Sequence, residues 1–221
     1  MSTNILYLVR HGENPANITR EFSHRIVDYS LTPRGVEQSR QTAEHFARLP
    51  ISAVYASPLK RASETAEIIA ARLGLSVLVR EEFREVNVGD FEGREPTDEA
   101  WAAHDRIFEA WFAGEYDLYF PGGENLRGLH ERMRRGIRDV VAGRDGEQVV
   151  IVCHGGILLA SVADLCPEVD VAPLAALPIP NCAITAIEMT AEGEELHGRL
   201  LAWAAADHLS EMPGGRAIQK W

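Results

Sequence analysis

The chain has 221 residues, 46% of them hydrophobic, and a formal net charge of −11 at pH 7. This length and composition predict one compact domain with a sizeable core. The negative charge repels nucleic acid and anionic membrane surfaces, which argues against both as partners.

Short apolar runs alternate with helical periodicity along the chain. Apolar side chains on successive residues are typical of strands that are buried on both faces of a parallel sheet. In chain order, the predicted elements are a strand at 5–9, a helix at 33–49, a strand at 53–56, a helix at 59–73, a strand at 75–79, a helical stretch at 101–112, a helix at 125–141, a strand at 149–153 followed by another helix, and two strands, read as antiparallel, at 183–189 and 196–203. This alternation predicts a three-layer α/β/α sandwich with a mostly parallel central sheet.

Two helices begin with the same signal, a capping hydroxyl residue followed by proline. Thr32-Pro33 starts the first, and Ser57-Pro58 precedes the second, which is expected to end before Gly74. Arg61 is therefore predicted to lie in the first turn of the second helix.

The segment 90–125 departs from this alternation because it is rich in aromatic and acidic residues. We interpret the chain as a single domain over 1–221, with a small cap inserted at about 90–125. A Gly- and Pro-containing tail follows the last predicted strand.

Two predicted strands end in a His-Gly turn. Arg10 and His11 follow the first strand, and His154 and Gly155 follow the strand at 149–153. Ligands of open α/β sheets bind beyond the carboxyl ends of the strands, so we expect both histidines at one site. Arg10 and Arg61 are placed where their guanidinium groups can grip the same anion, and guanidinium is well suited to phosphate.

These residues belong to sequence blocks that resemble the histidine phosphatase, or phosphoglycerate mutase-like, superfamily. The blocks are LVRHGE at 8–13, SPLKRASETA at 57–66, REVNVGDFEG at 84–93, PGGE at 121–124 and VCHGG at 152–156. They occur in the family's order over nearly the whole chain.

The resemblance implies a role for each of several residues. It makes His11 the nucleophile, Glu85 the proton donor, and Arg10, Arg61 and His154 the phosphate clamp. It further implies phosphate contact from Asn17, a substrate-facing acid at Glu124, and no metal cofactor; Gly155 is a further candidate for phosphate binding. The segment 20–30 lacks the glycine-containing turn that many relatives show, so no substrate contact is assigned there.

Elementary chemistry supports the same assignment. An imidazole attacks phosphorus only through an unprotonated nitrogen, which an ordinary histidine has at neutral pH and which two neighbouring arginines favour further. Phosphoryl transfer depends mainly on fixed cations and in-line positioning, which two arginines and a cationic or hydrogen-donating His154 can provide without Mg²⁺. The leaving alkoxide needs a proton, for which Glu85 is the first candidate; Glu13 and Glu92 are its rivals.

The sequence therefore predicts a metal-independent phosphatase that hydrolyses a small phosphorylated metabolite. One alternative is a cofactor-dependent phosphoglycerate mutase; the other is a noncatalytic phospholigand- or protein-binding module of the same fold. Hydrolysis is favoured because the only cations between Asp90 and Gly123 are Arg94 and Arg106, which does not suit a highly charged substrate.

The three cysteines, Cys153, Cys166 and Cys182, have no CxxC spacing. Their odd number favours reduced thiols and thus a cytoplasmic protein. The amino terminus shows no signal peptide, and no membrane span is predicted. A homodimer is left open.

Overall fold

The structure is a computed structural model that describes residues 2–210, so most of the predicted tail lies outside the described residues. At its centre, β1 (Ser2–Arg10) and β4 (Gln148–Cys153) run parallel and side by side. Leu8 and Ile151 face one hydrophobic cluster, whereas Val9 and Val152 face another on the opposite side of the sheet. Both strands are thus buried on two faces, which confirms the prediction from their continuous apolar runs.

The sheet has six strands in the order β3-β2-β4-β1-β5-β6. The first four are parallel, and the last two join as antiparallel neighbours. The remaining strands are β2 (Ile51–Ala56), β3 (Val77–Val79), β5 (Ile184–Glu192) and β6 (Glu195–Ala205). The predicted mostly parallel sheet is confirmed.

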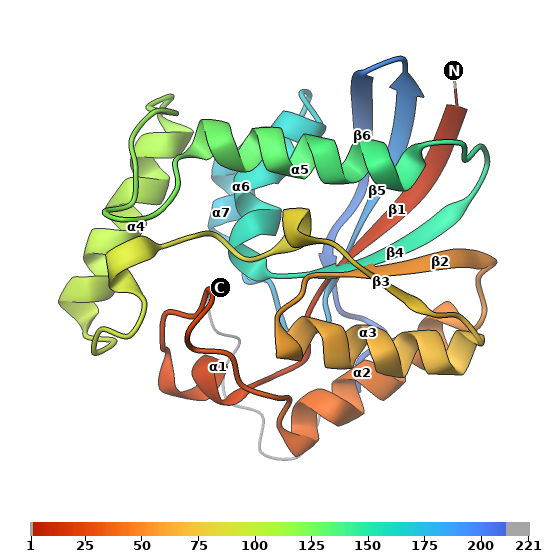
Figure 1. Ribbon diagram of the computed structural model, residues 1–221, viewed down its shortest axis with the longest axis horizontal. Helices are drawn as coiled ribbons and strands as arrows, with labels where there is room; N and C mark the ends of the chain where they lie inside the picture. The colour runs from red at the N-terminus through yellow and green to blue at the C-terminus, as the bar shows by residue number, and fades with distance from the viewer. Residues whose placement is uncertain (1, 211–221) are drawn as a thin grey trace.

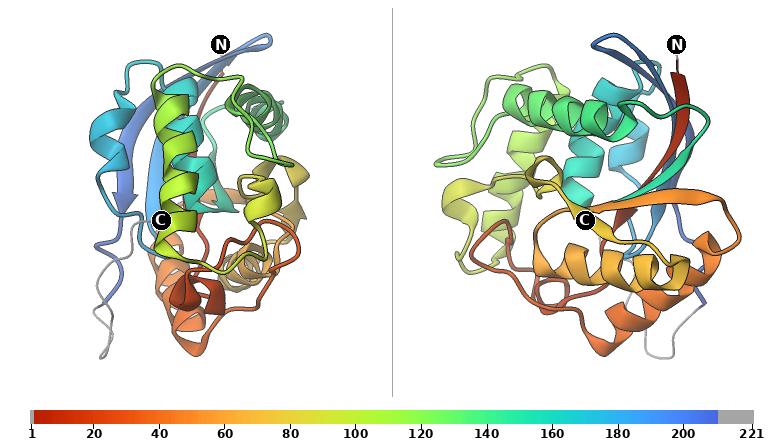
Figure 2. Two further views of the ribbon diagram at one scale, coloured as in Figure 1. Left: turned by 90° about the vertical axis from the view of Figure 1, so that its left-hand side faces the viewer. Right: turned by 45° about the vertical axis from the view of Figure 1, so that its right-hand side comes forward.

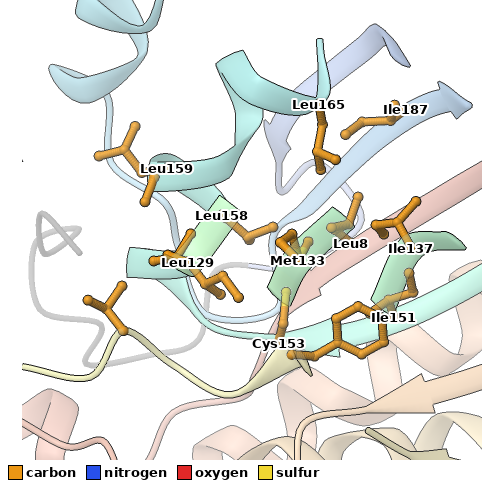
Figure 3. Close-up of a cluster of buried hydrophobic side chains, with 14 of the residues drawn as sticks. Leu8, Leu129, Met133, Ile137, Ile151, Cys153, Leu158, Leu159, Leu165 and Ile187 are labelled. Atoms are coloured by element: carbon orange, nitrogen blue, oxygen red, sulfur yellow. The ribbon is translucent and has the colours of Figure 1, made fainter. Parts of the chain in front are cut away.

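Helices cover both faces of this sheet (Figure 1). On one face lie α2 (Pro33–Phe46) and α3 (Lys60–Leu73), and on the other lie α5 (Leu126–Val141) and α6 (Gly155–Leu165). Figure 3 shows the cluster beneath the second pair, where Met133 and Ile137 pack near Leu8 and Ile151. The three-layer α/β/α sandwich is therefore confirmed.

The segment read as a cap contains a short 3₁₀ turn, η2 (Gly89–Phe91), and helix α4 (Asp98–Phe112). Figure 2 shows α4 standing beyond one end of the sheet, near α1 (Pro15–Thr19). The two elements flank the region into which β1 and β4 deliver their last residues.

The helical elements differ from the sequence predictions in two ways. Helix α2 ends at Phe46, not near Leu49. Sequence periodicity also missed α1 and α7 (Val171–Ala175), which are each too short to show a helical repeat, and a 3₁₀ turn, η1 (Glu81–Phe83). In residues 2–210, no helix is both long and apolar enough to cross a membrane.

The three cysteines are buried free thiols, as their spacing predicted. Burial raises the pKa of Cys166 and Cys182 to about 11 and that of Cys153 further. These thiols therefore stay protonated and serve as packing residues.

Candidate active site

Two histidines meet at the carboxyl ends of the two central strands. The β1–β4 register pairs Arg10 with Cys153, so the residues that follow, His11 and His154, are neighbours. The backbone N–H of His11 donates to the Cys153 carbonyl at 3.0 Å, and the two imidazole centroids lie 5.2 Å apart. Parallel pairing thus explains why residues that are distant in the sequence share one place.

The hydrogen bonds of His11 define which of its nitrogens can react. Nδ1 lies 2.7 Å from the carbonyl oxygen of Gly12, and a carbonyl only accepts, so the proton is assigned to Nδ1 and the lone pair to Nε2. Nε2 in turn accepts from Arg61 Nε at 3.1 Å. Burial, followed by the charges of Arg61 and Arg10, holds the pKa of His11 well below its usual value. Nε2 is therefore available as a nucleophile at neutral pH.

Two buried arginines flank this imidazole. Arg10 is the last residue of β1 and donates to the Ile179 carbonyl, and Arg61, in the first turn of α3 as predicted, donates to the Ser23 carbonyl at 3.0 Å. Arg10 Nε and Arg61 Nη1 are buried without a hydrogen-bond partner. Burial lowers the pKa of both guanidinium groups to about 10, although the charge of Glu85 opposes this, so both remain cations at neutral pH. Buried cations with unused donors suit an oxyanion ligand.

Glu85 lies between η1 and η2, against the start of α6. Its Oε1 accepts from the Ile157 amide at 2.8 Å, and its Oε2 accepts from the Gly156 amide at 3.1 Å. These amides belong to the first turn of the helix, where no helical carbonyl can pair with them. A Cβ at position 156 would lie 2.8 Å from Glu85 Oε1, so a larger residue there would displace the carboxyl group. The carboxyl group is consequently held in one position.

A cavity of about 460 Å³ opens beside His11. Most of the site residues predicted from the sequence line it: Arg10, His11, Asn17, Arg61, Glu85 and Gly155. His154 and Glu124 are not part of the lining. In the part of the chain that the structure describes, no group of three or more His, Cys, Asp and Glu side chains could hold a metal ion.

His154 lies fully buried next to His11. Its Nε2 is 2.7 Å from the Ser57 hydroxyl, and its Nδ1 has no hydrogen-bond partner. Burial, followed by the charges of Arg61 and His11, lowers the pKa of His154 well below its usual value, so a neutral ring replaces the cationic form considered from the sequence.

Ser57 was predicted to cap the helix that follows it, and this prediction is wrong. Helix α3 starts at Lys60, and its N-cap residue is Leu59, which provides no side-chain hydrogen bond. The Ser57 hydroxyl instead contacts His154, and it accepts a hydrogen bond from the Leu59 amide at 3.4 Å. The serine thus belongs to the site and not to the helix cap.

Asn17 and Asn181 form an amide network beside His11. Asn17 Oδ1 accepts from the Asn14 amide at 3.1 Å and from Asn181 Nδ2 at 3.0 Å. Asn181 Nδ2 also donates to the His11 carbonyl at 3.0 Å. Since the oxygen of Asn17 is occupied, its amide nitrogen is the group that can donate to a bound anion.

Glu124 is engaged in a two-pronged ion pair. Its oxygens accept from Arg132 at 2.7 and 2.9 Å, and one of them also accepts from the Asn87 amide at 2.8 Å. Arg132 further donates to the carbonyls of Arg84 and Glu85. The observed contacts of Glu124 therefore support the segment that contains Glu85, and its contact with substrate stays a prediction.

A comparison with protein families decides what kind of protein has this site. The family model described as "Histidine phosphatase superfamily (branch 1)" matches residues 6–201. The chain belongs to the histidine phosphatase superfamily. This confirms the resemblance found in the sequence and the phosphatase class of enzyme that it implied.

Named relatives of this histidine phosphatase include both phosphatases and mutases. "Putative phosphoserine phosphatase 2" of Hydrogenobacter thermophilus is 33% identical, over 86% of this chain and 91% of its own. "Probable phosphoglycerate mutase GpmB" of Erwinia tasmaniensis is 31% identical, over 83% and 84%. Among solved structures, a mycobacterial glucosyl-3-phosphoglycerate phosphatase in complex with VO3 superposes with a TM-score of 0.77 at 26% identity, over 91% of this chain and 99% of that chain.

In this histidine phosphatase, a loop at 23–28 covers Arg61 and is held by Glu92. A single carboxylate oxygen, Oε1 of Glu92, lies 2.6–3.1 Å from the backbone amides of residues 24–27 and accepts from all of them. Those amides keep the pKa of Glu92 below its usual value, although burial opposes them. At the two ends of the loop, the Ser23 carbonyl and the Asp28 carboxylate both face Arg61, the latter at 3.8 Å.

Sequence reasoning treated Glu92 only as a rival proton donor, and it missed Ser57 and the Arg132 contacts. The loop departs from the family's glycine-containing turn, and Glu92 supplies the hydrogen-bond acceptor that stabilises it. The available signal was the absence of that glycine-containing turn. A loop with a different conformation leaves backbone amides that need another acceptor, and here four consecutive amides share one.

Glu92→Gln is expected to raise the KM for an aryl phosphate by about 10-fold, because it weakens charge-assisted hydrogen bonds worth about 1.5–3 kcal/mol. The loop then positions Arg61 less well, while the nucleophile is untouched and kcat changes less than KM. Steady-state kinetics measure the split. Glu95→Gln is the control, since it removes an exposed charge from the same segment. Equal effects of the two changes would contradict the positioning role.

The lowered pKa values of His11 and His154 predict a pH-dependent stability. Below about pH 6.5 both histidines bind protons in the unfolded chain, whereas the buried imidazoles of the folded protein stay unprotonated. The free energy of unfolding therefore decreases as the pH decreases through that range. Thermal melts between about pH 7.5 and about pH 5.5 should show a decreasing Tm. His11→Gln should flatten this dependence; an unchanged slope would remove His11 from its cause.

Proposed function

We propose that this protein hydrolyses a small phosphomonoester through a phosphohistidine intermediate on His11. The observation that supports this most is the environment of His11 Nε2: an unprotonated nitrogen beside two buried arginines with unused donors, at the edge of a cavity. A nucleophile without an anion site, or an anion site without a nucleophile, would not by itself support phosphoryl transfer.

In the first step, His11 Nε2 forms a bond to phosphorus and the bond from phosphorus to the ester oxygen breaks. Arg10 and Arg61 neutralise the charge on the phosphoryl oxygens, and Glu85 gives its proton to the leaving alkoxide. In the second step, water attacks the phosphorus of the phosphohistidine, Glu85 takes a proton from that water, the bond from phosphorus to Nε2 breaks, and inorganic phosphate leaves. The Gly12 carbonyl accepts from Nδ1 throughout and so supports the ring while Nε2 is phosphorylated.

The remaining predicted residues have supporting roles in this proposal. Asn17 donates its amide N–H to the phosphate, and the Gly155 backbone lines the phosphate end of the cavity. His154 packs against His11 and assists as a neutral hydrogen-bonding ring. Glu124 acts through Arg132 on the segment that contains Glu85.

A phosphoglycerate mutase is the second candidate because mutases are among the relatives. The cavity lining argues against it: apart from Arg10 and Arg61, the only arginine or lysine among the described lining residues is Arg20. A mutase substrate has a second strongly anionic group, which needs further cations. Hydrolysis of a less anionic ester fits better.

The test is turnover of p-nitrophenyl phosphate by the purified protein in the presence of EDTA. Persistent turnover is expected, because none of the proposed steps uses a metal ion. Absence of turnover would point to the noncatalytic alternative, and loss on chelation would point to a metal enzyme. Isomerisation of 3-phosphoglycerate that is stimulated by 2,3-bisphosphoglycerate would instead support the mutase.

Three further expectations belong to this proposal. The chain acts as one domain with residues 90–125 as its cap. It works in the cytoplasm, which suits its free thiols. Its partner is a small phosphorylated substrate, without nucleic acid or membrane, and size-exclusion chromatography with light scattering would test for the homodimer.

A further inference from the structure

The cavity beside His11 has two ends with opposite charge. Its phosphate end contains Arg10 and Arg61, each of which has a buried nitrogen without a hydrogen-bond partner. Its other end, where the leaving group of an ester would lie, is formed by α4 and by the chain that follows α1. The acidic residues lining that end are Glu21, Asp105 and Glu109, and the aromatic ones are Phe22, Trp101, Phe108 and Phe112.

Helix α4 supplies most of this second end from one face. Trp101, Asp105, Phe108 and Phe112 follow one another at intervals of four, three and four residues, which places them on the same side of a helix. Glu109 follows Asp105 by four residues and extends the acidic row. One helix face thus presents rings and carboxylates together.

These carboxylates are not matched by arginine or lysine. Asp105 contacts His104 at 2.9 Å, and Glu21 accepts from the hydroxyl groups of Thr19 and Tyr29. Glu109 forms no ion pair with a residue that the structure describes. The leaving-group end therefore has an excess of negative charge.

The one arginine at this end is already engaged. Arg20 pairs with Asp98 at 3.2 Å, and its guanidinium stacks over the Trp101 ring, 5.7 Å from the centroid. It is therefore a poor receptor for a second anionic group of a substrate. Its stacking also shows that the aromatic wall of the cavity accepts a cation.

We propose that the leaving group of the substrate contains an ammonium group, so that the preferred substrates are phosphomonoesters of amino alcohols. The phosphate binds to the arginines, and the ammonium lies among the α4 rings and the carboxylates of Asp105 and Glu109. Opposite charges at the two ends of the cavity then fix the orientation of the ester. This inference rests on the proposed phosphatase function and names its substrate class.

The experiment compares phosphocholine with 3,3-dimethylbutyl phosphate, a neutral ester of the same shape. The two esters have the same shape, and the inductive effect of the ammonium on the leaving alkoxide is the same in every variant. The change in the ratio of their kcat/KM values when the α4 carboxylates are removed therefore isolates the recognition of the charge. Phosphocholine is expected to be favoured by about 10-fold, as for a partly desolvated cation–π contact with added carboxylates. Phosphoethanolamine should also exceed the neutral ester, and 3-phosphoglycerate should be slower than it.

Variants of α4 connect the preference to this wall. In Glu109→Gln, and in the double variant that also carries Asp105→Asn, the ratio of kcat/KM for phosphocholine to kcat/KM for 3,3-dimethylbutyl phosphate should decrease toward 1. Glu99→Gln removes an exposed charge from the same helix outside the cavity lining and should leave the ratio unchanged.

The outcomes separate the two proposals. Equal kcat/KM for the charged and neutral esters, or a preference for 3-phosphoglycerate, would overturn the ammonium inference while p-nitrophenyl phosphate is still hydrolysed. If p-nitrophenyl phosphate is not hydrolysed either, the phosphatase function itself is wrong. A preference that survives both α4 substitutions would place the ammonium elsewhere and overturn the proposed site.

Discussion

His11→Ala is expected to reduce the turnover of p-nitrophenyl phosphate by about 10⁴-fold or more, because it removes the nitrogen that is proposed to attack phosphorus. In the native protein, the Gly12 carbonyl keeps the proton on Nδ1, and the lone pair of Nε2 accepts from Arg61 at the edge of the cavity. Water has no comparable positioning or nucleophilicity. Phosphate binding should decrease much less, since Arg10 and Arg61 remain.

The measurement pairs steady-state kinetics with a trapping experiment. Acid-labile, base-stable phosphate should appear on the native protein during turnover and be absent from the variant. His197→Ala, on the exposed surface of β6, is the control for histidine removal in general. Activity within about 10-fold of the native value, or phosphate still trapped on the variant, would exclude His11 as the nucleophile.

Glu85→Gln is expected to slow alkyl phosphates by about 10²–10⁴-fold but p-nitrophenyl phosphate far less. An alkoxide needs a proton as it leaves, whereas p-nitrophenolate is stable without one. Glutamine keeps one oxygen that can accept from the amides of α6, so the loss reports on proton transfer more than on position.

Leaving-group dependence of kcat/KM measures this difference directly. A series of esters with rising leaving-group pKa should give a steeper decline for the variant than for the native protein. Glu13→Gln is the comparison, because Glu13 pairs with Arg34 at 3.2 Å and does not line the cavity. An equal loss on aryl and alkyl esters would remove Glu85 from the proton-donor role.

The position of the catalytic centre was predictable from the sequence because its two histidines follow the carboxyl ends of strands. His11 and His154 each follow a continuous apolar run, and such runs become adjacent parallel strands that end at one edge. Arg61 was predicted in the first turn of α3 because Pro58 marks a helix start. In each of these cases, local patterns alone place the backbone.

The supporting contacts were not predictable in the same way. Glu92, Ser57 and Arg132 act through hydrogen bonds to backbone groups or side chains far away in the sequence, and no periodicity records such contacts. The Ser57-Pro58 signal even suggested a different use for the serine. Side-chain partners depend on tertiary structure, which a pattern of apolar residues leaves undetermined.

The attachment of His11 to a strand buried on two faces affects how the protein can open. The His11 amide is bonded to Cys153 within the central sheet, so its hydrogen exchange should require near-global unfolding. The amides at 24–27 depend on one carboxylate and can exchange through a local opening. The nucleophile is therefore held more firmly than the loop that positions Arg61, and a local opening of that loop can change phosphate binding while His11 keeps its place.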